Sequence, residues 1–181
     1  MRIIAGEFRG RVLLGPEGEQ TRPVTDRAKQ SIFDTLGDAF AETKVFDVFS
    51  GTGSFGLEAL SRGASHAVFF ESHRPTVARL RQNIATLKVE DRATIVTSDA
   101  FRWQSAEVKV AGLISLDPPY RFVREQPQQL RQLAQKLAPL LATDGVLIFR
   151  RDPADRLELP GLKVRESKLY GQMEVEFYSL L

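Results

Sequence analysis

The stretch from Lys44 to Glu71 reads KVFDVFSGTGSFGLEALSRGASHAVFFE, and it predicts a strand, a glycine-rich turn, a helix and a second strand. The runs KVFDVFS and AVFFE are short and apolar without alternation, as expected for strands that are covered on both faces. The segment FGLEALSR between them has helical character. Strand, helix and strand in this order indicate neighbouring strands of a parallel sheet.

The same alternation continues along the chain. Apolar runs ATIVT, GLISL and GVLIF alternate with helical patterns in TVARLRQNIATL and LRQLAQKLAPLL. The closing LKVRESKLYGQMEVEFYSLL holds two strand-like runs joined at Tyr170 and Gly171, which predict an antiparallel hairpin at one edge. We therefore expect an α/β, Rossmann-like fold with a mostly parallel seven-stranded sheet and helices on both faces.

The first 24 residues are predicted to form an arm and loop, separate from a domain over residues 25–181. RIIAGEFRGRVLL reads as two short strands around a glycine-bearing turn, that is, a small β-hairpin. GPEGEQTRP, from Gly15 to Pro23, has the composition of a loop. A helix is expected from about Asp26, because the apolar residues that follow it fall on one face at helical spacing.

Composition excludes several classes of protein. The 181 residues are 43% hydrophobic and 27% charged, and no apolar run approaches the roughly 20 residues of a membrane span. The N-terminus lacks the pattern of an export signal, so a cytoplasmic protein is expected. A monomer is expected as well. Because Cys is absent and His occurs twice, neither a cysteine nucleophile nor a metal site is expected.

The glycine-rich turn points to a nucleotide-like cofactor. Gly51, Gly53 and Gly56 satisfy G-x-G-x-x-G, and Glu71 follows 20 residues after Gly51, where an acid binds ribose hydroxyls. A plain strand-to-helix turn is the alternative. S-adenosylmethionine is favoured over NAD, since Asp47 before the turn suits an ammonium group and no second mononucleotide-binding half follows.

Two acids sit near the expected ends of later strands. Asp99 follows the third core strand and could meet the cofactor, although it could also cap the segment AFRW. Asp117 ends the fourth core strand and begins DPPY. Pro118 and Pro119 stop the strand rigidly, so a carboxylate and a carbonyl are held side by side and complement an exocyclic amine. Tyr120 offers a flat face for stacking a base; the alternative is an ordinary strand-ending turn.

These residues resemble the RsmD family, bacterial enzymes that methylate guanine N2 in small-subunit ribosomal RNA with S-adenosylmethionine. The similarity lies in RIIAGEFRGRVL, TRPVTDRAKQSIFDTL, DVFSGTGSFGLEALSRGA, DPPY and YGQMEVEFY, and it covers nearly the whole chain. The first, second and last of these are the specific ones, because glycine loops and DPPY also occur in DNA and other RNA amino-methyltransferases.

The resemblance implies two groups of site residues, and the basic residues of the chain suggest a third. The cofactor-binding group is Thr25, Asp26, Asp47, Phe49, Ser50, Gly51, Thr52, Gly53, Gly56, Glu71, Ser72, Asp99 and Ala100. The catalytic group is Asp117, Pro118, Pro119 and Tyr120. A hypothetical phosphate-gripping group is Arg2, Arg9, Arg11, Arg22 and Arg121, for which the alternative is an ordinary solvated surface.

The expected partner is 16S ribosomal RNA, either free or within the small subunit or an assembly intermediate. Three other functions stay open from the sequence: a DNA adenine or cytosine amino-methyltransferase, a non-catalytic rRNA-binding assembly factor, and a nicotinamide oxidoreductase. We expect a DNA enzyme to need a target-recognition domain, and the short chain argues against that alternative.

Overall fold

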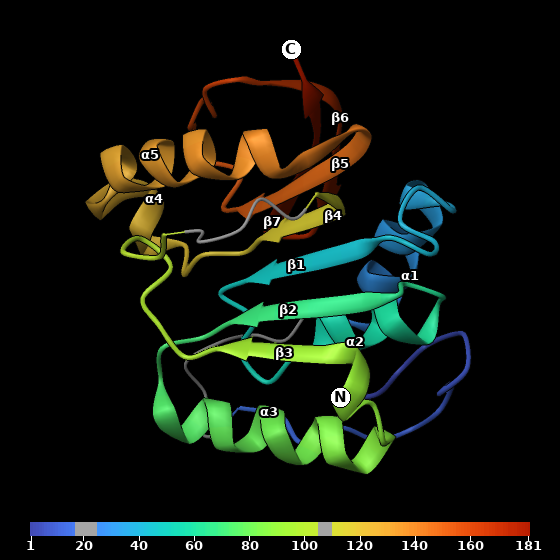
Figure 1. Cartoon of the computed structure of the whole chain (residues 1–181). Helices are drawn as coiled ribbons and strands as arrows, with labels where there is room; N and C mark the ends of the chain where they lie inside the picture. The colour runs from blue at the N-terminus through green and yellow to red at the C-terminus, as the bar shows by residue number, and fades with distance from the viewer. Residues whose placement is uncertain (17–24, 105–109) are drawn as a thin grey trace.

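Seven strands form one sheet in the order β3-β2-β1-β4-β5-β7-β6 within the residues that the computed structural model describes, which are 1–16, 25–104 and 110–181 (Figure 1). Strands β1 to β5 are parallel, and β7 and β6 add an antiparallel hairpin at the edge. This confirms the expected fold class. The strands are β1 Lys44–Val48, β2 His66–Phe70, β3 Ala93–Val96, β4 Ala111–Leu116, β5 Leu141–Arg151, β6 Leu162–Tyr170 and β7 Met173–Leu180.

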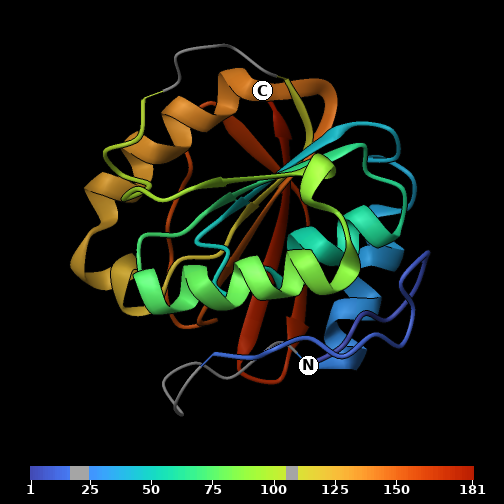
Figure 2. The ribbon, with the colours of Figure 1, turned by 60° about the horizontal axis from the view of Figure 1, so that its bottom comes forward.

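Helices cover both faces of the sheet (Figure 2). They are α1 Asp26–Leu36, α2 Ser54–Ser61, α3 Arg74–Leu87, α4 Arg121–Glu125 and α5 Pro127–Leu137, with short 3-10 turns η1 Glu90–Arg92 and η2 Ala138–Leu140. Apolar residues of α1, α2 and α3 pack in one core cluster, and those of α4 and α5 pack in another. The sequence pattern did not predict α4.

Side chains of one strand alternate between these two clusters, because successive residues of a strand point to opposite faces. Val45 belongs to the cluster with α1 to α3, and Phe46 belongs to the cluster with α4 and α5. Phe69 and Phe70 of β2 divide in the same way. Parallel strands buried on both faces therefore read as continuous apolar runs.

The carboxyl ends of β1, β2 and β4 meet at one edge, at the left of Figure 1. Val48 lies opposite Phe70 on one side and opposite Leu116 on the other. The segments that follow these three residues are the glycine loop, the turn with Glu71, and DPPY. Segments that are far apart in the sequence are thus brought to one edge, as the chain order predicted.

The two sides of the N-terminal arm pair in the antiparallel sense of a hairpin, but within the described residues 1–16 they form an isolated bridge and no extended strands. Its described part has a single antiparallel bridge, between Arg2 and Val12, with tight turns between them. Backbone bonds join the two sides, from Ile3 N–H to the Arg11 carbonyl and from Leu13 N–H to the Met1 carbonyl, each at 2.9 Å. Other backbone groups of the arm bond to α2 and α3: Phe8 N–H donates to Ser61 Oγ at 2.9 Å, and Leu14 N–H donates to Asn83 Oδ1 at 2.8 Å. A hairpin this short needs such partners, because two strands by themselves are marginal in water.

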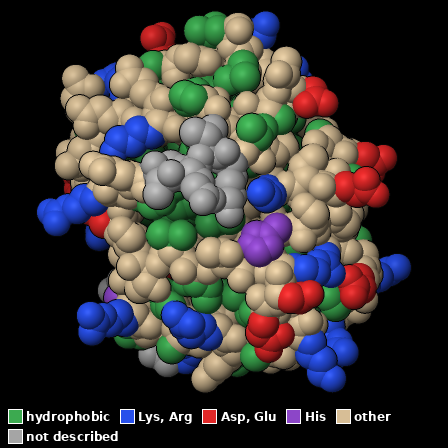
Figure 3. All heavy atoms as spheres, viewed as in Figure 1, with side chains coloured by type: hydrophobic (Ala, Val, Ile, Leu, Met, Phe, Trp, Pro, Cys, Tyr) green, Lys and Arg blue, Asp and Glu red, His purple; other side chains and the backbone are tan. Residues whose placement is uncertain are grey.

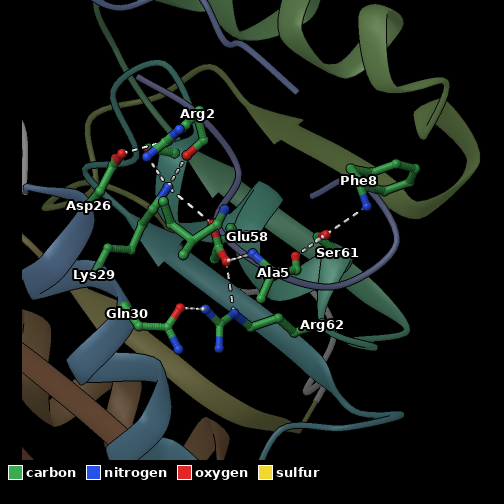
Figure 4. A network of polar contacts seen from close by, with 12 residues as sticks. Arg2, Ala5, Phe8, Asp26, Lys29, Gln30, Glu58, Ser61 and Arg62 are labelled. Atoms are coloured by element: carbon green, nitrogen blue, oxygen red, sulfur yellow. Dashed lines mark hydrogen bonds and ion pairs between the residues drawn. The ribbon is translucent and has the colours of Figure 1, made fainter. Parts of the chain in front are cut away.

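A buried charged network fixes the arm to the domain (Figure 4). Glu58 of α2 is fully buried and accepts the backbone N–H groups of Ile4 and Ala5 at 2.8 and 3.1 Å. Lys29 of α1 pairs with Glu58 at 3.1 Å and donates to the Arg2 carbonyl at 2.7 Å. Burial is the main reason that the pKa of Lys29 is lowered, against the opposing effect of Glu58.

Candidate active site

The three glycines of the loop serve different purposes. Gly53 has a φ of 85°, and a Cβ there would lie 2.4 Å from Leu80 Cδ1. A Cβ on Gly56 would lie 2.4 Å from the ring of Phe69. Both positions need glycine so that α2 can pack on the sheet and α3. Gly51 has a φ of 55° with open space beside it, so this position leaves room for a ligand against the backbone.

The side chain of Asp47 on β1 bonds to the first turn of α2. Its side chain is 2% exposed, and Oδ2 accepts the Gly56 N–H at 2.9 Å. Burial raises the pKa of Asp47 to about 7, and the nearby charge of Asp117 adds to the rise. The bonds from Gly56 and Ser115 and the charge of Arg150 act in the opposite direction. Near neutral pH this carboxyl is therefore poised between its charged and neutral forms.

Glu71 joins the end of β2 to the loop. Its Oε2 accepts the Gly51 N–H at 3.0 Å, and its Oε1 accepts the His73 N–H at 2.8 Å. Ser72, between the two, is exposed. Ser50 in the loop has a buried Oγ that finds no hydrogen-bond partner among the described residues. A buried hydroxyl without a partner is uncommon and marks a place where a ligand can supply the missing bond.

Aromatic rings line the edge between the loop and DPPY. Phe49 has a φ of 63°, which is unusual for a bulky residue, and its ring makes edge contacts with Phe101 at 5.6 Å and Phe122 at 6.0 Å. Asp99 Oδ1 accepts the Phe101 N–H at 3.0 Å, and Ala100 between them is buried. The carboxylate of Asp99 therefore stabilises the turn, which was the simpler of its two sequence interpretations.

The remaining cofactor candidates lie at the start of α1 and within the loop. Thr25 caps α1, with Oγ1 accepting the Ala28 N–H at 3.2 Å. Asp26 pairs with Arg2 of the arm at 2.7 Å. Lys29, one turn on, donates to Ser54 Oγ at 3.2 Å, which places α1 beside the first residue of α2. Thr52 is buried, and its carbonyl accepts from a side-chain amide of α3.

The DPPY segment begins directly beside β1. Asp117 N–H donates to the Val48 carbonyl at 3.2 Å, so the carboxylate stands next to the entry of the glycine loop. The Pro119 carbonyl accepts from Phe122 N–H at 2.8 Å, whereas the Pro118 carbonyl accepts no hydrogen bond among the described residues. Tyr120 is half-buried, and burial is the main cause of its raised pKa.

The sequence analysis did not identify Arg150, whose side chain reaches Asp117 of the DPPY segment. Its Nε donates to Asp117 Oδ1 at 2.7 Å, and its second terminal nitrogen pairs with Asp117 Oδ2. The acceptors of DPPY are thus accompanied by a guanidinium group. One signal was available, because LIFRRD places two consecutive arginines at the end of a buried strand, where a charge needs a partner.

The predicted phosphate-gripping residues are spread over the surface. Arg9, Arg11 and Arg121 are exposed, and Arg121 lies over the Phe122 ring at 5.5 Å. Arg2 is 62% exposed although it pairs with Asp26. Arg22 lies outside the described residues. On the face seen in Figure 3, basic side chains are scattered among neutral and acidic ones.

The site fits a bound S-adenosylmethionine better than a metal ion. The open space at Gly51 and the orphaned Ser50 hydroxyl lie within one loop whose backbone also engages Glu71. Among the residues that the structure describes, no group of three or more His, Cys, Asp or Glu side chains could hold a metal. No helix in these ranges is long and apolar enough to cross a membrane.

The sequence matches the family described as "Conserved hypothetical protein 95" over residues 1–179. The chain belongs to this family. The resemblance to the RsmD family is thereby confirmed. A relative from Bacillus subtilis, named putative rRNA methyltransferase YlbH, is 34% identical over 98% of both chains.

A second relative is ribosomal RNA small subunit methyltransferase D of Escherichia coli. It is 37% identical to the family member described here over 67% of this chain, and the match spans 61% of the relative's own length. Among solved structures, a putative methyltransferase from E. coli named yhhF superposes with a TM-score of 0.85 at 30% identity, over 99% of this chain and 97% of the other.

A more distant structure, an S-adenosylmethionine-dependent methyltransferase from Clostridium acetobutylicum, covers 84% of this chain and 90% of the other with a TM-score of 0.68. Its identity of 9% supports the shared fold. The family member described here therefore has the Rossmann-like fold of these methyltransferases.

Proposed function

We propose that this protein transfers a methyl group from S-adenosylmethionine to the exocyclic N2 of a guanine in 16S ribosomal RNA. The observation that carries the proposal is the junction of two sites: Asp117 bonds to β1 at Val48, three residues before Gly51. A donor held by the loop and an amine held at Asp117 would share one sheet edge. The printed names of the relatives support ribosomal RNA as the substrate.

We assign the cofactor's amino-acid end to the loop around Gly51 and its ribose to Glu71. When bound, the sulfonium group supplies an activated methyl. The Ser50 hydroxyl gains a partner, and the two N–H bonds that Glu71 accepts hold its carboxylate in place. Phe49 and Phe101 form an apolar wall that excludes water.

The chemistry at DPPY requires position more than reactive groups. An aromatic amine is a poor nucleophile because its lone pair is delocalised into the ring. Asp117 and the Pro118 carbonyl accept its two hydrogens, which favours a pyramidal nitrogen with a free lone pair. Tyr120 stacks on the base, and the carboxylate of Asp117 accepts the proton that the nitrogen releases after transfer.

The RNA contacts are assigned to Arg121 of α4 and to the arm, residues 1–24, which acts as an appendage of the methyltransferase domain, residues 25–181. Arg2 and Arg9 line one hollow at the surface of the arm, and Arg11 and Arg121 are exposed. We include Arg22 in the same group by its place in the sequence. These residues grip phosphates while the target base turns toward Tyr120. The enzyme acts as a monomer in the cytoplasm, where small-subunit RNA is assembled.

Methyl transfer with isotopically labelled donor tests the activity. The expected product from unmodified small subunits or their RNA is N2-methylguanosine at one position, identified by mass spectrometry. Asp117→Ala is expected to abolish turnover while it preserves RNA binding. If neither native protein nor this variant transfers a methyl group and both bind RNA, a non-catalytic assembly factor is favoured. Methylation of DNA but not RNA supports the DNA alternative, and binding of NAD by calorimetry supports an oxidoreductase.

The arm is tested separately. Arg9→Glu with Arg11→Glu should weaken RNA binding and reduce the dependence of log affinity on log salt by about 1.5, since each phosphate contact contributes about 0.7 to 0.9. Lys163→Glu with Arg165→Glu on the exposed edge strand β6 is the matched control, with the same change in charge. Equal effects of the two double variants would show that only net charge matters.

A further inference from the structure

Arg150 and Asp117 are neighbours because of strand register. Leu116 of β4 lies opposite Phe149 of β5, so the residues that follow them, Asp117 and Arg150, lie side by side at the carboxyl ends of the strands. The guanidinium binds the carboxylate through two nitrogens. Paired donors of this kind fix the plane of both groups and the distance between them. The edge therefore presents an acceptor and a cation in fixed relation.

Both partners keep unused hydrogen-bonding capacity. A carboxylate has about four lone-pair positions and a guanidinium has about five N–H bonds, and this pair uses two of each. Among the described residues the side chain of Arg150 bonds to no group besides Asp117. Its side chain is 14% exposed, and none of its nitrogens is among the sealed, partnerless atoms of these residues. The remaining N–H groups are therefore accessible to a ligand.

A guanine base complements this arrangement along one edge. Its N2 and N1 carry adjacent hydrogens, and its O6 is an acceptor beyond them. The bonds to Arg150 leave one outward lone pair on each Asp117 oxygen, so one of these oxygens can accept from both nitrogens while a free N–H of Arg150 donates to O6. Arginine is also the side chain that most often recognises guanine O6 in nucleic acids. Charge and geometry thus match on both sides.

Adenine and cytosine fit less well. In each of them the exocyclic amine stands beside a ring nitrogen with a lone pair, which would face the carboxylate of Asp117 without a hydrogen between them. Adenine also lacks a carbonyl for Arg150. An unpaired acceptor against a partly buried carboxylate is strongly unfavourable.

We propose that Arg150 selects guanine at this site by donating a hydrogen bond to O6 while Asp117 holds N1–H and N2–H. This inference rests on the proposed function, because it states how the same site chooses its base. Arg150 is then a specificity-determining residue that touches substrate. A residue that only orients Asp117 would affect every base with an amine to the same extent.

The experiment measures single-turnover methyl transfer to small-subunit RNA with either guanine or 2-aminopurine at the modified position. The analogue keeps the N2 amine but lacks O6 and N1–H. We expect native enzyme to lose about 100-fold in rate with 2-aminopurine, through both the lost O6 bond and the N1 lone pair that then faces Asp117. Arg150→Met should show only the second part of this penalty, about tenfold between the two bases. Arg150→Met should also be slower than native enzyme on guanine by about 10- to 100-fold.

An equal 2-aminopurine penalty in native enzyme and Arg150→Met would overturn the proposal. Arg124→Met is the matched control, because Arg124 is exposed on α4 and pairs with Asp155; its penalty should equal that of native enzyme. If Arg150→Met does not fold by circular dichroism, Arg150→Lys replaces it: a penalty reduced at least threefold supports the proposal, and an unchanged one refutes it. Failure of the proposed function looks different, because native enzyme would then methylate no guanine N2.

Discussion

Replacing Asp47 by Asn should change how the stability of the protein depends on pH. Burial raises the pKa of this carboxyl to about 7 in the folded protein, against about 3.8 for a solvated aspartate. Between these values the folded state holds a proton that the unfolded state has lost, so native stability falls as pH rises through this window. A difference of about three pH units corresponds to about 4 kcal/mol.

The amide of Asn keeps an oxygen for the Gly56 N–H but carries no charge at any pH. The free energy of unfolding of Asp47→Asn minus that of native protein should therefore rise by about 1.4 kcal/mol per pH unit between about pH 4 and 7, and level off above pH 7. Urea unfolding at intervals from pH 4.5 to 8.5 measures this difference. Other titrating groups are common to both proteins and cancel. A flat difference would refute the assignment of burial as the dominant influence on Asp47.

Three further outcomes are expected. Gly53→Ala should lower the free energy of unfolding by about 2 to 4 kcal/mol, because the new Cβ meets Leu80 and φ is positive. Thermal unfolding measures this loss of stability. Gly10→Ala is the control for backbone strain, because Gly10 also has a positive φ but has open space beside it. Glu58→Gln should lower the free energy of unfolding by about 3 to 5 kcal/mol and raise the hydrogen-exchange rates of the Ile4 and Ala5 amides. Slow exchange of these two amides in the variant would contradict the buried network. Tyr170→Phe removes the hydrogen bond to Ser31 and should lower the free energy of unfolding, measured by urea unfolding, by only about 1 kcal/mol.

Much of the fold followed from local patterns. Apolar runs predicted the strands, helical spacing predicted α1, α3 and α5, and the order of elements predicted a mostly parallel sheet. Gly171, with a φ of 61°, marks the hairpin turn that the sequence predicted within one residue. These features depend on neighbours in the chain, so the sequence is sufficient to find them.

The arm was harder to predict. Its residues read as two strands, yet Ile4 and Ala5 donate to Glu58, more than 50 positions away. The short helix α4 after DPPY was missed because five residues hold too little periodicity to detect. At such places the structure is decided by contacts between residues far apart in the sequence, and these contacts form only when the chain folds.

The candidate site divides in the same way. Motif spacing by itself placed the glycine loop, Glu71 and Asp117 at one sheet edge, because parallel strands align their carboxyl ends. Strand register decided the rest: of the two consecutive arginines, Arg150 turns to Asp117 and Arg151 turns to Glu176 on the opposite face. Which strands lie side by side, and in what register, is settled by packing over the whole sheet, so the partner of Asp117 became visible only in three dimensions.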